Sequence, residues 1–108
     1  LVTQSGSPTL MQGELRCAMA NLQAVFPLVR CYLANVPSYP GSLWSFLVAS
    51  KRPVAVLSGA APSRPRATIA RRFEKAGLAT RYYTPNLHFA SFALPRCLED
   101  ALERGAAT

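Results

Sequence analysis

The sequence is poor in acidic residues and in histidine, and both shortages limit the chemistry that it can carry. Five Asp and Glu stand against twelve Lys and Arg, so the 108 residues have a formal net charge of +7. His88 is the only histidine, and no Cys, Asp or Glu clusters around it in the sequence. A metal site needs several such ligands together, so we expect no metal and a structural role for the His88 ring.

Cysteine is also scarce. Cys17, Cys31 and Cys97 lie far apart, and no Cys-x-x-Cys pair occurs. This pattern argues against a disulfide framework and a zinc motif, and it predicts buried, free thiols that pack in the core of a cytoplasmic protein.

No run approaches the ~18–20 apolar residues of a membrane helix, and no basic start leads into an apolar run. The sequence therefore predicts neither a membrane span nor a signal peptide.

Half of the residues are nevertheless hydrophobic, which excludes a disordered polar chain, and their spacing predicts alternating strands and helices. Residues 1–5 are apolar and β-branched, and they predict the end of a buried strand. Ser7 and Pro8 are typical of a helix start, and Pro27 is expected to end that helix. Apolar residues at spacings of three and four predict its inward face, which consists of Met11, Leu15, Ala18, Leu22 and Val25.

Two short apolar runs follow, at residues 28–36 and 43–50, and both predict strands. The six residues between them, 37–42, are rich in Pro and Gly and predict a loop. Such a short connection permits antiparallel pairing, whereas a parallel crossover needs about a dozen residues or more. We therefore expect the two strands to form an antiparallel hairpin.

The second half of the chain predicts mainly helices. Residues 51–65 contain several Pro and predict a loose connection, after which a helix is expected from about Arg66, with Gly77 just past its end. Its inward residues are expected to be Ile69, Phe73 and Ala76. A short extended piece is predicted at residues 78–83.

Two further helical segments are predicted before the end of the chain. Thr84 and Pro85 are typical of a cap and first position, and predict a helical turn through His88. Pro95 is expected to begin a last helix, which Gly105 stops. Four aromatic residues are expected to fill the space between sheet and helices: Trp44, Tyr82, Tyr83 and Phe92.

A basic cluster leaves a second interpretation open. Eight cations lie between residues 51 and 81, against one acid, Glu74. A small non-enzymatic module could use the Arg-rich helix at 64–75 to bind nucleic acid or an acidic protein. The cluster lacks interleaved exposed aromatics and any familiar recognition motif, so we favour a solvated helix face.

Three stretches carry a more specific signal. The first is Val-Thr-Gln-Ser-Gly at residues 2–6, followed by a helix. The second comprises Val-Phe-Pro at 25–27, Val-Pro-Ser-Tyr-Pro at 36–40 and Trp-Ser-Phe-Leu-Val-Ala-Ser-Lys at 44–51. The third is Arg-Tyr-Tyr-Thr-Pro at 81–85, with His88 and Phe-Ala-Leu-Pro at 92–95. In order and spacing, they resemble the carboxy-terminal part of the spermidine synthase family, the polyamine aminopropyltransferases, from residue 1 to about residue 104.

This resemblance implies an α/β fold. Residues 1–108 would form the C-terminal portion of a Rossmann-like, S-adenosylmethionine-dependent methyltransferase-like doubly wound sheet, ending in an antiparallel hairpin with flanking helices. The nucleotide-binding half would lie outside this segment. Such enzymes transfer the aminopropyl group of decarboxylated S-adenosylmethionine, their co-substrate, to putrescine or a related amine. They are commonly dimeric, so the resemblance implies a homo-oligomer.

The resemblance also implies which residues touch the substrate. In the family pattern the positions of Gln4 and Tyr39 line the amine pocket, and we expect both to lie just past the ends of strands. Among the four aromatic residues above, Trp44 has the best claim to partial exposure in that pocket, because it closely follows the Tyr39 loop. The family's glycine-rich loop and its general-base Asp belong upstream of residue 1, so we expect no catalytic residue here and no activity from this segment alone. The chain is then either a fragment of a longer enzyme or a truncated relative that has lost the activity. The chain departs from the family at Gly41 and Ser42, where Ser more often precedes Gly.

Overall fold

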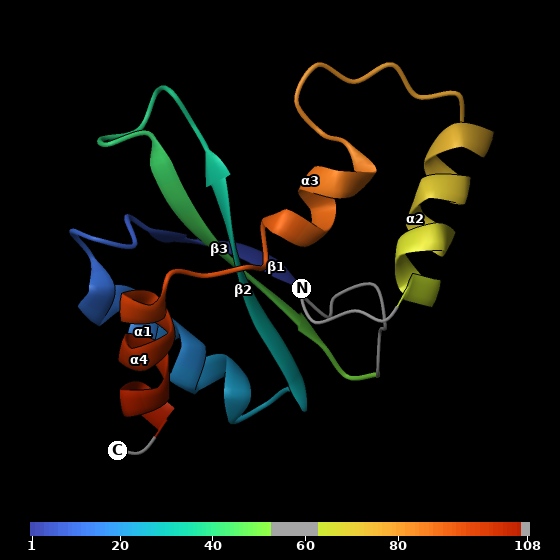
Figure 1. The fold of residues 1–108 in the computed structure, drawn as a ribbon. Helices are drawn as coiled ribbons and strands as arrows, with labels where there is room; N and C mark the ends of the chain where they lie inside the picture. Colours follow the sequence, from blue (N-terminus) through green and yellow to red (C-terminus); the bar gives the residue numbers. More distant parts are fainter. Residues whose placement is uncertain (53–62, 107–108) are drawn as a thin grey trace. The chain divides into compact units, whose positions relative to one another are not determined.

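The structure is a computed structural model, which describes residues 1–52 and 63–106, and of residues 63–66 and 104–106 it describes only the backbone. It divides into two compact units (Figure 1). The first unit comprises Leu1–Pro53 and Leu94–Thr108, and the second comprises Val54–Ala93. The first unit holds the sheet, and the second holds two helices, so each is described by itself.

A three-stranded antiparallel sheet forms the centre of the first unit. Its strands are β1 (Val2–Gly6), β2 (Leu28–Asn35) and β3 (Leu43–Ser50), in the order β1-β3-β2. The central strand β3 therefore pairs with both of the others, antiparallel in each case. The predicted hairpin of β2 and β3 is confirmed, with boundaries within one residue of those expected from the sequence.

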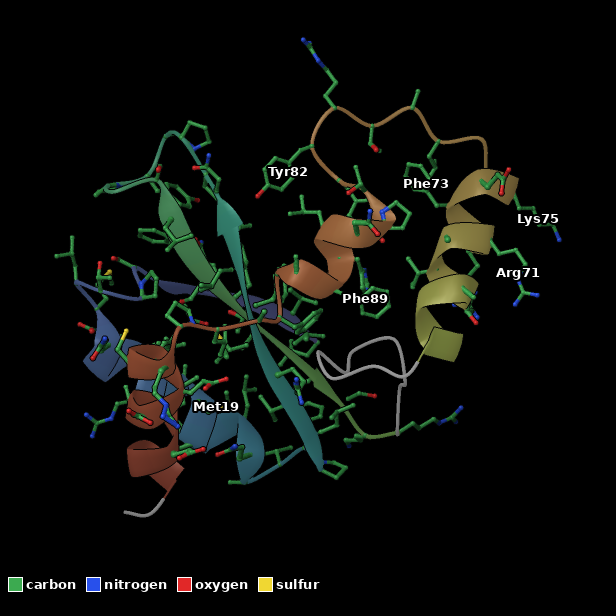
Figure 2. The ribbon with its side chains drawn as sticks, viewed as in Figure 1. Met19, Arg71, Phe73, Lys75, Tyr82 and Phe89 are labelled. Carbon is green, nitrogen blue, oxygen red and sulfur yellow. The ribbon has the colours of Figure 1, made fainter. Side chains whose placement is uncertain are left out.

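Helices α1 (Gln12–Gln23) and α4 (Arg96–Ala106) pack against each other, and α1 also contacts all three strands (Figure 1). Because side chains alternate along a strand, only one face of the sheet is turned to these helices. Cys31 and Leu47 lie opposite each other on that face, while Tyr32 and Phe46 lie opposite each other on the reverse face. The core cluster consists of Leu15, Met19, Cys31, Leu47 and Leu98. Met19 is labelled in Figure 2.

Helix α1 begins later than the sequence predicted. The Ser7 hydroxyl does cap the backbone, since its oxygen accepts the amide hydrogen of Leu10 at 3.1 Å, but this bond closes a turn at residues 8–10. The helix itself starts at Gln12, after Met11, which makes no side-chain cap among the described residues. A Ser-Pro pair favours the start of any helical turn, including an isolated one. Here the turn at residues 8–10 is separate from helix α1, so the predicted helix start is too early.

The far end of α1 and the start of β1 are also more exposed than expected. Helix α1 ends at Gln23, before Pro27, so Val25 lies outside it and is 64% exposed. In β1 the second half is buried, as predicted, but Leu1 and Val2 are exposed. The prediction of a fully buried first strand is therefore wrong for its opening residues.

Helix α4 shows that one glycine need not end a helix. Pro95 accepts the first helical hydrogen bonds, from the amides of Leu98 and Glu99, so the predicted start is confirmed to within one residue. The helix continues through Gly105 to Ala106, and the predicted stop at Gly105 is wrong. Glycine in a helix costs about 1 kcal/mol relative to alanine, which neighbouring helical residues can offset.

The second unit contains α2 (Ser63–Lys75) and α3 (Pro85–Ala90), which contact each other. Helix α2 starts three residues before the expected Arg66, and Gly77 follows its end with a φ of +61°. Ile69 is buried as predicted and Phe73 is half-buried, but Ala76 is exposed. Residues 78–83 are described and form no strand. Of the predicted connection at 51–65, residues 53–62 lie outside the described residues.

Helix α3 begins as predicted, with Thr84 as its cap and Pro85 in its first turn. The Thr84 hydroxyl accepts the amide hydrogen of Leu87 at 3.0 Å, and Pro85 occupies the first helical turn. Aromatic rings gather beside this helix: the Tyr83 hydroxyl lies 3.0 Å from Nδ1 of His88, whose ring contacts Phe89 and Phe92. These contacts support the predicted structural role for His88. Tyr82, in contrast, is 53% exposed, so its predicted role in the core is wrong.

The three cysteines differ in their surroundings. All are free thiols, but only Cys31 is buried, whereas Cys17 and Cys97 are exposed on α1 and α4. The prediction that all three pack in the core is wrong for these two. Burial raises the pKa of the Cys31 thiol from 9.0 to about 11, because the thiolate is poorly solvated beside apolar side chains.

Raising the pH should therefore destabilise the fold through Cys31. Between pH 9.0 and about 11 the unfolded chain loses the thiol proton and the folded chain keeps it, so the free energy of unfolding falls by up to ~1.4 kcal/mol per pH unit. Urea unfolding at pH 8, 9 and 10 measures this slope. The variant Cys31→Ala is the control, and an equal slope in both proteins would contradict the prediction.

Candidate functional site

Gln4 and Tyr39 are the two residues expected to touch the substrate, and Trp44 is expected to be partly exposed beside them. The three lie in different parts of the first unit. Gln4 is the third residue of β1 and is paired with Phe46 on the adjacent strand β3. Trp44 is the second residue of β3, and Tyr39 lies in the loop between β2 and β3. The expected place of Tyr39 is confirmed. Gln4 lies within its strand, so the expectation that it follows the strand end is wrong.

The structure brings these three side chains into contact, and we call them the Gln4–Tyr39–Trp44 cluster. The indole Nε1–H of Trp44 donates a hydrogen bond to Oε1 of Gln4, with 3.2 Å between nitrogen and oxygen. The Trp44 ring also packs against the Tyr39 ring, with centroids 4.5 Å apart and planes inclined by 50°. Gln4 and Tyr39 are exposed and Trp44 is half-buried, so polar groups of the cluster can reach a ligand.

A tight turn holds Tyr39 in this position. The amide of Tyr39 donates to the carbonyl of Val36 at 3.0 Å, and the amide of Ser42 donates to the carbonyl of Tyr39 at 2.9 Å. Pro40 takes the second position of the latter turn, and Gly41, with a φ of +77°, takes the third. This combination is typical of a type II turn, which accounts for the order Pro-Gly in this loop.

A bulge in β1 shapes the strand next to Gln4. The register of the β1–β3 pair shifts between Gln4 and Gly6, and Gly6 has a φ of +89°, which favours glycine. The fully buried hydroxyl of Ser45 donates to the Gly6 carbonyl at 2.7 Å and so secures the bulge. Neither this bulge nor the role of Ser45 was predicted from the sequence, although a glycine within a strand pattern, here Gly6, is itself a signal for a bulge.

Aromatic rings continue from the cluster along the reverse face of the sheet. Phe46 is two residues beyond Trp44, and its ring stacks on Tyr32 with centroids 5.2 Å apart and an interplanar angle of 13°. Partial burial raises the pKa of Tyr32, because the phenolate loses solvation there. The cluster therefore borders an aromatic pair on this face, which also carries Arg30, the partner of Val48.

The chemistry available in this cluster is hydrogen bonding, not proton abstraction by a carboxylate. Gln4 offers an amide oxygen and an NH₂ group, and Tyr39 offers a hydroxyl that both donates and accepts. All five acidic residues of the chain lie exposed on helices, as Glu14, Glu74, Glu99, Asp100 and Glu103. Within the described residues, the strands and the β2–β3 loop thus hold no carboxylate. The cluster can orient the nitrogens of an amine but supplies no strong base.

Residues 1–52 and 63–106 contain neither a metal-binding cluster nor a membrane-spanning helix. No group of three or more His, Cys, Asp or Glu is placed there to hold a metal ion. In the same residues, no helix combines the length and the apolar character that crossing a membrane requires.

The basic part of the chain forms an exposed helix face. Arg71, Arg72 and Lys75 are exposed, and Figure 2 shows Arg71 and Lys75 on the side of α2 away from Phe73. The side chains of Arg64 and Arg66 lie outside the described ones. An amphipathic helix with its cations in solvent accounts for this arrangement.

The comparisons with known proteins all find members of one enzyme family. The family model described as spermine/spermidine synthase domain matches residues 1–58. A polyamine aminopropyltransferase of Moorella thermoacetica is 38% identical over 104 residues, which cover 94% of this chain and 32% of that protein. A polyamine aminopropyltransferase of Desulforudis audaxviator is 40% identical over 101 residues, which cover 92% of this chain and 32% of that protein.

The fold agrees with solved structures as well. Spermidine synthase of Thermotoga maritima superimposes with a TM-score of 0.76 at 27% identity, over 95% of this chain and 33% of that one. A spermidine synthase in complex with the transition-state analogue AdoDATO matches with the same values. The predicted fold class is thereby confirmed. The chain spans about a third of the length of these relatives.

Proposed function

Because the chain belongs to the spermine/spermidine synthase family, we propose that residues 1–108 form the carboxy-terminal segment of a polyamine aminopropyltransferase. The proposed reaction joins the nitrogen of putrescine, or of a related amine, to the aminopropyl carbon of decarboxylated S-adenosylmethionine. The carbon–sulfur bond breaks, the sulfonium leaves as a neutral thioether, and the attacking nitrogen releases a proton, giving spermidine when putrescine is the acceptor. We propose a cytoplasmic homo-oligomer.

The observation that carries this proposal is the Gln4–Tyr39–Trp44 cluster. Gln4 and Tyr39 are the residues that the family resemblance assigns to the amine, and they come together through Trp44 although 35 positions separate them in the sequence. An amide oxygen and a phenolic oxygen are suitable acceptors for the N–H groups of an amine. We assign both residues to binding and orienting the amine acceptor, with Trp44 beside them.

The cluster does not complete the reaction by itself. The attacking nitrogen must lose a proton, which calls for a positioned base, and the described strands and β2–β3 loop hold no carboxylate. We therefore propose that the base, an Asp, and the groups that hold the nucleotide belong to the preceding part of the enzyme. With a net charge of +7, this segment also repels a cationic acceptor, so that part should be acidic around the amine.

Substitutions at Tyr39 and Gln4 test the assignment in the complete enzyme. Tyr39→Phe and Gln4→Met each remove a hydrogen-bonding group and retain most of the side-chain volume. A hydrogen bond to a charged or reacting group contributes about 1.5–3 kcal/mol, so we expect KM for the amine to rise about 10- to 100-fold or kcat to fall similarly. Initial rates measured against amine concentration give both constants.

Two matched controls accompany these variants. Tyr82→Phe changes an exposed tyrosine of the second unit, and Gln23→Met changes an exposed glutamine at the end of α1. Neither should alter the amine titration. If Tyr39→Phe and Gln4→Met also leave it unchanged, the assignment of the cluster to the amine is wrong.

A further inference from the structure

The hydrogen bond between Trp44 and Gln4 determines how the side-chain amide of Gln4 is oriented. An indole N–H can only donate, so the Gln4 atom 3.2 Å from Trp44 Nε1 must be the oxygen. This chemistry determines the orientation of the amide, which can otherwise turn by half a rotation and exchange its oxygen and nitrogen. In the Gln4–Tyr39–Trp44 cluster, one lone pair of Oε1 is used by Trp44 and a second lone pair remains.

We infer that Trp44 is a positioning residue, which fixes the amide of Gln4 so that its oxygen accepts an N–H group of the amine. This inference rests on the proposed function. The physical reason is the polarity of the two ends of the amide. An ammonium or amine N–H is attracted to the oxygen and repelled by the NH₂ group. An amide free to turn would present the wrong end for part of the time.

The packing of Trp44 supports this role. Trp44 contacts both residues assigned to the amine, Gln4 through its indole N–H and Tyr39 through its ring. Trp44 is half-buried and is not one of the five residues of the core cluster, and its neighbour Ser45 is turned to the opposite, buried face. Removing only the indole N–H should therefore leave the core of the unit intact.

A double-mutant cycle in the complete enzyme tests the inference. Trp44→Phe removes the N–H and keeps a ring against Tyr39. We expect KM for the amine to rise about 3- to 10-fold, with KM for decarboxylated S-adenosylmethionine unchanged and kcat changed less than twofold. In the Gln4→Met background, Trp44→Phe should have no further effect on KM for the amine, because the positioned amide is already absent.

The outcomes separate this inference from the proposed function. If Gln4→Met raises KM for the amine and Trp44→Phe does not, the positioning role is wrong and the proposed function stands. If Trp44→Phe has the same effect with and without Gln4, Trp44 acts independently and the inference is overturned. If Tyr39→Phe and Gln4→Met both leave the amine titration unchanged, the proposed function fails, and the inference fails with it.

A measurement without turnover tests the hydrogen bond directly. In a ¹H–¹⁵N spectrum of the complete enzyme, the indole N–H signal of Trp44 is identified as the one that Trp44→Phe removes. Gln4→Met should shift this signal and accelerate its exchange with solvent several-fold, while Gln23→Met should leave it unchanged. An indole signal that is insensitive to Gln4→Met would overturn the inference.

Discussion

Replacing Leu47 with alanine should lower the free energy of unfolding of this chain by about 2–5 kcal/mol. Leu47 is fully buried in the middle of the central strand, directly opposite Cys31, and belongs to the core cluster formed with α1 and α4. Alanine removes the apolar contacts and leaves a cavity that the paired strands on both sides of β3 cannot close. Urea unfolding followed by far-ultraviolet circular dichroism measures the loss.

Leu43→Ala is the matched control for this substitution. Leu43 lies on the same strand but is 41% exposed, so it contributes much less apolar burial. We expect it to change the free energy of unfolding by no more than about 1 kcal/mol. Equal losses in the two variants would show that Leu47 does not lie in the core.

The second large effect is expected at Phe89 in the other unit. Phe89→Ala should lower the free energy of unfolding by about 3–5 kcal/mol, because the ring is only 2% exposed and lies 4.9 Å, centroid to centroid, from the His88 ring. Thermal unfolding monitored by near-ultraviolet circular dichroism reports on the aromatic environment. Figure 2 labels Phe89.

Tyr82→Ala provides the comparison within the same unit. It also removes an aromatic ring, but one that is half exposed to solvent. We expect a loss well below that of Phe89→Ala, of about 1 kcal/mol or less. A larger loss at Tyr82 than at Phe89 would reverse the assignment of buried and exposed rings in this unit.

The strands were predictable because two local signals agree there. The apolar runs that became β2 and β3 are bounded by a loop with Pro40 and Gly41, and that loop is too short for anything but an antiparallel return. The helix ends were harder to predict. Ser7 and Pro8 favour a helical turn whether or not that turn continues into a helix. Gly105 lowers the stability of α4 but does not end it. Tertiary packing decides where such helices begin and end, and the local pattern of a single sequence does not reveal these contacts.

For the candidate site, the family resemblance pointed to Gln4, Tyr39 and Trp44, but not to their contacts. Gln4 and Trp44 are 40 residues apart, and they meet only because β1 pairs with β3 rather than with β2. Local spacing carries no information about which strand becomes central. The bulge at Gly6 adds to this difficulty, because it changes the register by one residue just beyond Gln4.

The strand order β1-β3-β2 has a consequence for how the protein acquires its structure. The β2–β3 hairpin closes a short loop, whereas β1 must find β3 across a long intervening stretch of chain, which costs more entropy. Folding that starts from local contacts would therefore form the hairpin, with Tyr39 and Trp44 already adjacent, before β1 arrives with Gln4. The Gln4–Tyr39–Trp44 cluster, which we propose to bind the amine, would then be completed at a late step of folding, and a partial opening that released β1 would break it while the hairpin persisted.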